Sequence, residues 1–85
     1  MPRLKLKELA EARGLTISKL QRQTGLDMGM VRRYWYNEGR KGPLSEVNLI
    51  ALFKIADVLG VKPGELLAEG QEDEEAIYGP ALVAA

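Results

Sequence analysis

The sequence of 85 residues contains neither cysteine nor histidine. Without cysteine, the chain forms no disulfide, no thiolate zinc site and no thiol nucleophile, and it needs no oxidising compartment. It also shows no glycine-rich nucleotide-binding pattern and no nucleophile with a candidate base partner. We therefore expect a protein that is not an enzyme, has no catalytic residues and binds neither a metal nor a cofactor.

Long apolar runs are missing as well. The longest apolar segments fall far short of the roughly 18 residues that cross a bilayer, and residues 1–7 lack the apolar stretch of a signal peptide. We expect a cytoplasmic protein that does not bind a membrane. A chain of this length is expected to form one small domain with a compact core.

Charge is balanced in total but not along the chain, which has 12 basic and 12 acidic residues. All twelve bases but only six acids lie between Arg3 and Lys62, which gives this stretch a net charge of +6. Residues 63–85 carry the other six acids and no base, a net charge of −6. A single charge is as often plain solvated surface, but a separation of this size favours a body that binds a polyanion, followed by an acidic tail.

Apolar residues at helical spacing predict an all-α fold with five helices and no β-strand. Thr16, Asp27 and Ser45 are the expected N-caps of the second, third and fourth helices. Residues 37–44 contain two glycines, a proline and two adjacent bases, which is typical of a loop. The expected helices cover about residues 5–13, 17–24, 28–36 and 46–59, and a short fifth helix starts at Pro63 and carries Leu66 and Leu67. The apolar repeat of the fourth helix consists of Leu49, Leu52, Ile55, Ala56 and Leu59.

A helix-turn-helix pattern occupies residues 20–36. Leu20 supplies an apolar anchor, Gly25 suits the left-handed residue that ends one helix, and Asp27 caps the next. Two short helices joined in this way meet at a steep angle, and the second has a diameter that the major groove of DNA accepts. The pattern therefore predicts DNA recognition.

A second motif, Leu-Phe-Lys-Ile-Ala-Asp-Val-Leu-Gly-Val-Lys-Pro-Gly-Glu-Leu-Leu, follows at residues 52–67. Together the two motifs resemble the Cro and lambda-repressor-like, XRE-type DNA-binding domain over about residues 6–67. The resemblance implies a compact five-helix fold, sequence-specific binding to double-stranded DNA and usually a homodimer on a palindromic operator. The chain departs from the family at Gln21, where a small residue is usual because the two helices cross closely, and at the aromatic run 34–36.

The outward side of the third helix follows from helical geometry. At about 100° per residue, with Val31 toward the core, Tyr34 and Trp35 lie within about 60° of it and are expected in the core. The outward residues are the expected base-reading set. Within this set, the resemblance gives the base-reading role to Met28, Gly29 and Arg33. Arg33 is the strongest candidate because its planar fork pairs with guanine O6 and N7, although it could also be a solvated arginine. This base-reading set is Met28, Gly29, Arg32, Arg33 and Tyr36.

A second set is expected to bind phosphates and fix the position of the protein on the duplex. Ser18 and Lys19 start the second helix, whose amide protons and positive dipole end suit a phosphate. Asn37, Arg40 and Lys41 offer donors and positive charge in the loop after the third helix.

Residues 1–68 are thus expected to form the DNA-binding domain, and residues 69–85 an acidic, partly apolar tail that is a linker, a dimerisation segment or disordered. The corresponding function is a transcriptional repressor that binds a palindromic operator as a dimer through the third helix. The alternative is a protein-interaction module, such as an antitoxin-like or regulatory protein that holds a protein partner through its tail.

Overall fold

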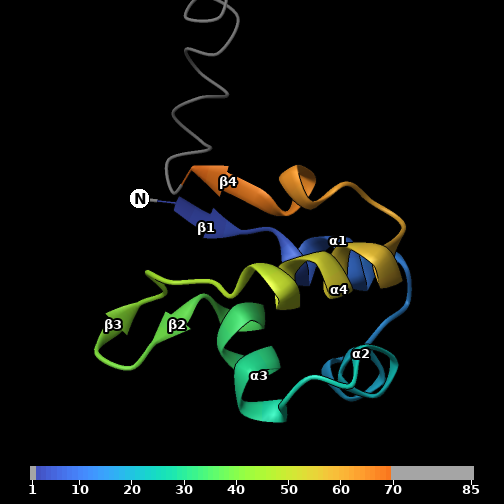
Figure 1. The fold of residues 1–85 in the computed structure, drawn as a ribbon, viewed down its shortest axis with the longest axis horizontal. Helices are drawn as coiled ribbons and strands as arrows, with labels where there is room; N and C mark the ends of the chain where they lie inside the picture. The colour runs from blue at the N-terminus through green and yellow to red at the C-terminus, as the bar shows by residue number, and fades with distance from the viewer. Residues whose placement is uncertain (1, 70–85) are drawn as a thin grey trace, which may run out of the picture.

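A computed structural model describes residues 2–69, in which helices pack around one core (Figure 1). The expected tail therefore lies outside the described residues, apart from Glu69. Within the described range, no helix is long and apolar enough to cross a membrane. The elements in chain order are β1 (Pro2–Leu4), α1 (Leu6–Ala12), α2 (Ile17–Thr24), α3 (Met28–Tyr36), β2 (Glu38–Gly39), β3 (Gly42–Pro43), α4 (Leu49–Leu59), the 3-10 helix η1 (Pro63–Leu66) and β4 (Leu67–Glu69).

The caps of α2 and α3 are those that the sequence predicts. The Thr16 hydroxyl accepts a hydrogen bond from the Lys19 amide at 3.2 Å, and the Asp27 carboxylate accepts one from the Met30 amide at 3.2 Å. Gly25 ends α2 in the left-handed conformation, with φ 71°. The prediction of a helix-turn-helix is therefore confirmed at its two helices and at its turn.

The start of α4 differs from the prediction. The helix begins at Leu49, and its N-cap is Asn48, whose side chain accepts from the Ala51 amide at 3.0 Å. Ser45 lies exposed in the preceding loop and caps nothing, so its assignment as the cap was wrong. Asn48 is as good a cap as serine, and the Tyr34 hydroxyl accepts from its amide at 2.8 Å, which fixes the helix start there.

The expected fifth helix is a single 3-10 turn rather than an α-helix. It ends at Leu66, which is buried, whereas Leu67 is exposed and extended as the first residue of β4. β4 pairs with β1 in antiparallel register, with Leu67 opposite Leu4 and Glu69 opposite Pro2. This pairing competes with the helix for the backbone of Leu67 and ends it.

The prediction of no strand was also wrong. Besides β1 and β4, the strands β2 and β3 pair as a hairpin in the segment expected to be a loop. The strands are only two or three residues long, too short to show an alternating apolar pattern in the sequence. The part of the chain that the structure describes thus has four α-helices, one 3-10 turn and two small two-stranded sheets.

The core lies between the helices and beneath β1 and β4. α3 turns Val31, Tyr34 and Trp35 into it, which confirms the predicted core face of that helix. Leu49, by contrast, is exposed although it belongs to the apolar repeat of α4, because it is the first residue of the helix and lies beyond the core. The buried apolar residues are Leu4, Leu6, Ala10, Leu20, Val31, Tyr34, Trp35, Leu44, Ala51, Leu52, Ile55, Ala56, Leu59 and Leu66.

Candidate nucleic-acid interface

The turn between α2 and α3 is held by side chains of α2. The Gln21 amide nitrogen donates a hydrogen bond to the Leu26 carbonyl at 2.9 Å, and the Thr24 hydroxyl accepts one from the Leu26 amide at 3.3 Å. Both polar groups of the Leu26 backbone therefore have partners on α2. Gln21, which replaces a small residue of the family pattern, ties the turn to α2 and so fixes where α3 begins.

Gly29 makes room for the cap of α3. A Cβ atom at this position would lie 2.9 Å from the Asp27 carboxylate oxygen and 3.6 Å from an Arg33 guanidinium nitrogen. The first distance is shorter than real Cβ contacts, so any larger residue would push the capping carboxylate aside. The structure thus gives Gly29 a role in the cap of α3, in addition to its predicted place in the base-reading set.

The remaining residues of the predicted base-reading set differ in exposure. Met28, Arg32 and Tyr36 are exposed, whereas Arg33 is half-buried. The Arg33 guanidinium lies near Gly29, one turn nearer the start of α3. Tyr36 ends the helix, and the Lys7 ammonium of α1 lies 5.9 Å from the centre of its ring, a cation–π contact.

An open hollow of about 800 Å³ lies beside α3, between the β2–β3 hairpin and the loop that leads to α4. Three bases line it, one from α3 and two from the hairpin: Arg33, Arg40 and Lys41. Ser45 and Glu46 line its side toward α4. The positive charge of this hollow suits a polyanion such as the DNA backbone.

The hairpin carries its two bases at its tip. Arg40 and Lys41 form the turn between β2 and β3, and both are exposed. A Cβ at Gly39 would lie 2.8 Å from the Pro43 carbonyl oxygen, so the close approach of the two strands requires glycine there. A hydrogen bond of 3.0 Å from the Leu44 amide to the Asn37 carbonyl closes the base of the hairpin. The two cations are thus presented on a backbone with defined pairing.

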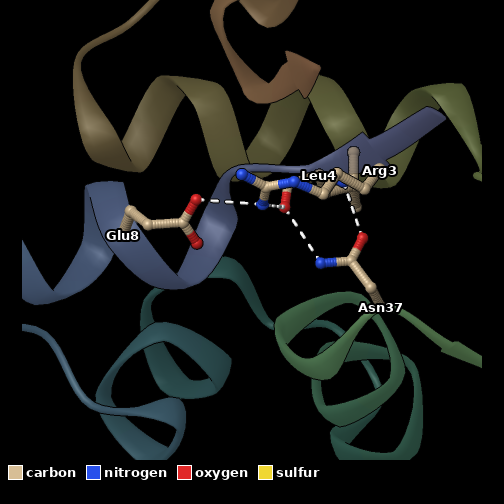
Figure 2. A network of polar contacts seen from close by, with 4 residues as sticks. All are labelled: Arg3, Leu4, Glu8 and Asn37. Atoms are coloured by element: carbon tan, nitrogen blue, oxygen red, sulfur yellow. Dashed lines mark hydrogen bonds and ion pairs between the residues drawn. The ribbon is translucent and has the colours of Figure 1, made fainter. Parts of the chain in front are cut away.

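Asn37 holds this hairpin to the body. It ends α3 in the left-handed conformation, with φ 56° and ψ 42°. Its amide oxygen accepts from the Leu4 amide at 2.6 Å, and its amide nitrogen donates to the Leu4 carbonyl at 3.0 Å (Figure 2). Arg3 extends beside it and pairs with Glu8 at 3.0 Å. The sequence does not predict this link, because only the tolerance of asparagine for a left-handed helix end can be inferred from it.

Ser18 and Lys19 lie exposed in the first turn of α2, the other helix of the pair. The structure therefore divides the predicted phosphate-binding set between the start of α2 and the hairpin after α3. Asn37 differs from the others, since both ends of its side-chain amide are engaged with Leu4.

A family model described as the Cro/C1-type HTH DNA-binding domain matches residues 5–68. The chain belongs to this family. The resemblance inferred from the two motifs is thereby confirmed, and the Cro/C1-type domain is a binder of double-stranded DNA and a transcription regulator. Searches of curated proteins and of solved structures gave no match. The Cro/C1-type family is not typically enzymatic, and residues 2–69 contain no group of three or more acidic side chains placed to hold a metal ion.

Proposed function

We propose that this Cro/C1-type domain is a repressor that binds a palindromic operator as a homodimer and reads the sequence with α3. The observation that carries the proposal is the two-sided character of α3. It buries Val31, Tyr34 and Trp35 in the core, and its other side carries the exposed Arg32 and the half-buried Arg33, beside a hollow lined by bases. A dimer bound in this way covers its operator and blocks access by other proteins, which is why we propose repression.

In this proposal Arg33 makes the main base contact. Its guanidinium lies toward the N-terminal part of α3, and the N-terminal residues of a recognition helix are those that contact base edges. A planar, bidentate donor pairs best with guanine. The other base-reading residues are Met28, Gly29, Arg32 and Tyr36, of which Met28 suits a thymine methyl group and Gly29 allows close approach of the backbone.

The phosphate contacts come from two sides of α3. Ser18 and Lys19 bind the backbone at the start of α2, and Arg40 and Lys41 bind it from the hairpin tip. Asn37 contributes by holding the hairpin base to Leu4, rather than by donating to a phosphate itself.

The alternative function is the binding of a protein partner through residues 69–85. The observation that favours it is the composition of this segment, which combines acids with apolar residues and contains no base. In that case removal of residues 70–85 abolishes partner binding and leaves the affinity for duplex DNA unreduced. Removal of the four acids at 72–75 is expected to raise nonspecific DNA affinity at low salt, because it reduces repulsion of the phosphates.

The deciding experiment is the selection of bound duplexes from a random pool at two salt concentrations. A repressor of this kind is expected to enrich one sequence with two inverted half-sites, about one helical turn apart or a multiple of it. The enriched sequence is also expected to persist at the higher salt, because base contacts are less sensitive to salt than phosphate contacts. A pool that remains random at both concentrations contradicts the proposal.

A further inference from the structure

α4 exposes three large apolar side chains on one side. Leu49, Ile50 and Phe53 are 66%, 67% and 55% exposed. At about 100° per residue, the three lie within an arc of about 100°, on little more than one helical turn. We call them the α4 cluster. The core is formed by the other side of α4, through Ala51, Leu52, Ile55, Ala56 and Leu59.

Neither the core nor the DNA contacts account for the α4 cluster. Single exposed apolar residues are common, but adjacent ones that form a patch mark an interaction surface. An apolar patch is a poor partner for the phosphate backbone, which is bound by charged and polar donors. The cluster therefore calls for a partner with an apolar surface of its own.

We propose that a second copy of this chain covers the α4 cluster, with the two α4 helices antiparallel about a two-fold axis. The inference rests on the dimer proposed above and names the surface that builds it. In this arrangement Phe53 of each copy packs against Leu49 and Ile50 of the other. A two-fold interface of this kind must be complementary to itself, so that each patch meets an identical one.

The charges around the α4 cluster are arranged so that two antiparallel copies are complementary to each other. Glu46 precedes the cluster in the chain and Lys54 follows it, and both are exposed. Neither forms an ion pair within residues 2–69. An antiparallel pairing brings Lys54 of each copy toward Glu46 of the other, at both rims of the interface. A parallel pairing would instead bring like charges together.

The size of the patch indicates how strong the dimer is. Three such side chains expose on the order of 300 Å² per copy, or about 600 Å² for two copies. A stable interface buries more than about 1,000 Å² in total, so polar residues such as Asp57 at the rim must supply the rest. We therefore expect a dimer that dissociates on dilution and is reinforced when both copies occupy adjacent half-sites.

Sedimentation of the full chain over a range of concentrations tests the apolar part. Phe53→Glu is expected to weaken self-association by about tenfold or more, the effect of losing a central apolar anchor. Leu67→Glu is the matched control, because Leu67 is an exposed leucine on β4 and not on α4. Self-association that is equal in the wild type and Phe53→Glu overturns the proposal, as does a wild type that is monomeric even on DNA with two half-sites.

Charge reversal tests the antiparallel arrangement. Glu46→Lys and Lys54→Glu are each expected to weaken the dimer, since each places like charges at both rims. The double variant exchanges the two charges and is expected to restore self-association toward the wild-type value. A double variant that is no better than the single ones overturns the antiparallel pairing.

DNA binding separates this inference from the function on which it rests. Phe53→Glu is expected to bind a duplex with one half-site as tightly as the wild type, and to lose about tenfold or more on a duplex with two half-sites. Equal loss on both duplexes would place Phe53 in the DNA interface and overturn the inference. Failure of the wild type to bind any selected duplex would instead contradict the proposed function.

Discussion

Asn37 and Leu4 are joined by two hydrogen bonds across 33 positions of the chain, one to each polar group of the Leu4 backbone. Leu4 is buried and Asn37 is half-buried, so the two bonds are partly shielded from water. The contact links the end of α3, the base of the basic hairpin and the strand β1. A residue expected to bind DNA thus holds together the elements that carry the proposed DNA-binding residues.

The stability of this link is measured by two substitutions. Asn37→Gly keeps the left-handed conformation and removes the amide, which leaves the Leu4 amide proton without its partner. We expect a loss of about 1 to 3 kcal/mol in the free energy of unfolding, measured in urea. Asn37→Ala is expected to cost about 1 kcal/mol more, because a Cβ atom strains a positive φ. Wild-type stability in both variants would show that the two bonds contribute nothing.

Trp35 provides a test of the core, since it is the only tryptophan of the sequence and 5% exposed. Its fluorescence is expected to be blue-shifted in the folded protein and to shift to the red on unfolding. Trp35→Ala is expected to cost about 3 to 5 kcal/mol, a large part of the stability of a small domain. The neighbouring Tyr36→Ala serves as control, because Tyr36 is exposed and its removal leaves no cavity. Similar losses in the two variants would contradict the assignment of Trp35 to the core.

Arg33→Ala tests base reading. On the selected operator we expect a loss of about 1 to 3 kcal/mol in binding free energy and a relaxed preference at one base pair. Lys62→Ala is the control, because Lys62 carries the same charge but directly precedes η1 and is not among the predicted DNA-binding residues. This variant is expected to change neither the affinity nor the base preference. An equal loss with Arg33→Ala on operator and random duplexes would make Arg33 a phosphate contact.

Lys41→Ala tests backbone binding by the hairpin. The affinity for operator and random duplexes is expected to fall alike, and the slope of log affinity against log salt to decrease by about one ion. Lys41→Arg keeps the charge and is expected to keep the slope. A slope that is unchanged in Lys41→Ala would remove Lys41 from the interface.

Local signals account for what the sequence predicted correctly. The helical spacing of apolar residues gave the positions of α1 to α3, and the side chains of Thr16 and Asp27 marked the starts of α2 and α3. The same spacing assigned Val31, Tyr34 and Trp35 to the core. Each of these signals depends on residues within one or two turns of each other, which is the range over which a sequence pattern is informative.

Two of the missed features depend on contacts between distant segments. The pairing of β1 with β4 holds the backbone of Leu67 in an extended conformation. The hydrogen bond from the Asn48 amide to the Tyr34 hydroxyl fixes the start of α4 after Asn48, and not after Ser45 as predicted. The hydrogen bond from Gln21 to the Leu26 carbonyl joins residues that are close in the sequence. It was missed because the family pattern at this position concerns the size of the side chain and not its amide group. The exposure of Leu49 was missed because its spacing is that of a core position.

The pairing of β1 with β4 also brings the first and last elements of the described chain side by side. It places Pro2 opposite Glu69. The two strands lie across the body from the turn between α2 and α3 (Figure 1). A two-residue turn is sufficient to join strands in such a register. A circularly permuted form of residues 2–69, closed by such a turn in place of residues 70–85 and opened after the exposed Gly14 between α1 and α2, is therefore expected to fold and to bind the same operator. Its new ends would lie beside the helix-turn-helix, where an attached probe would report directly on contact with DNA.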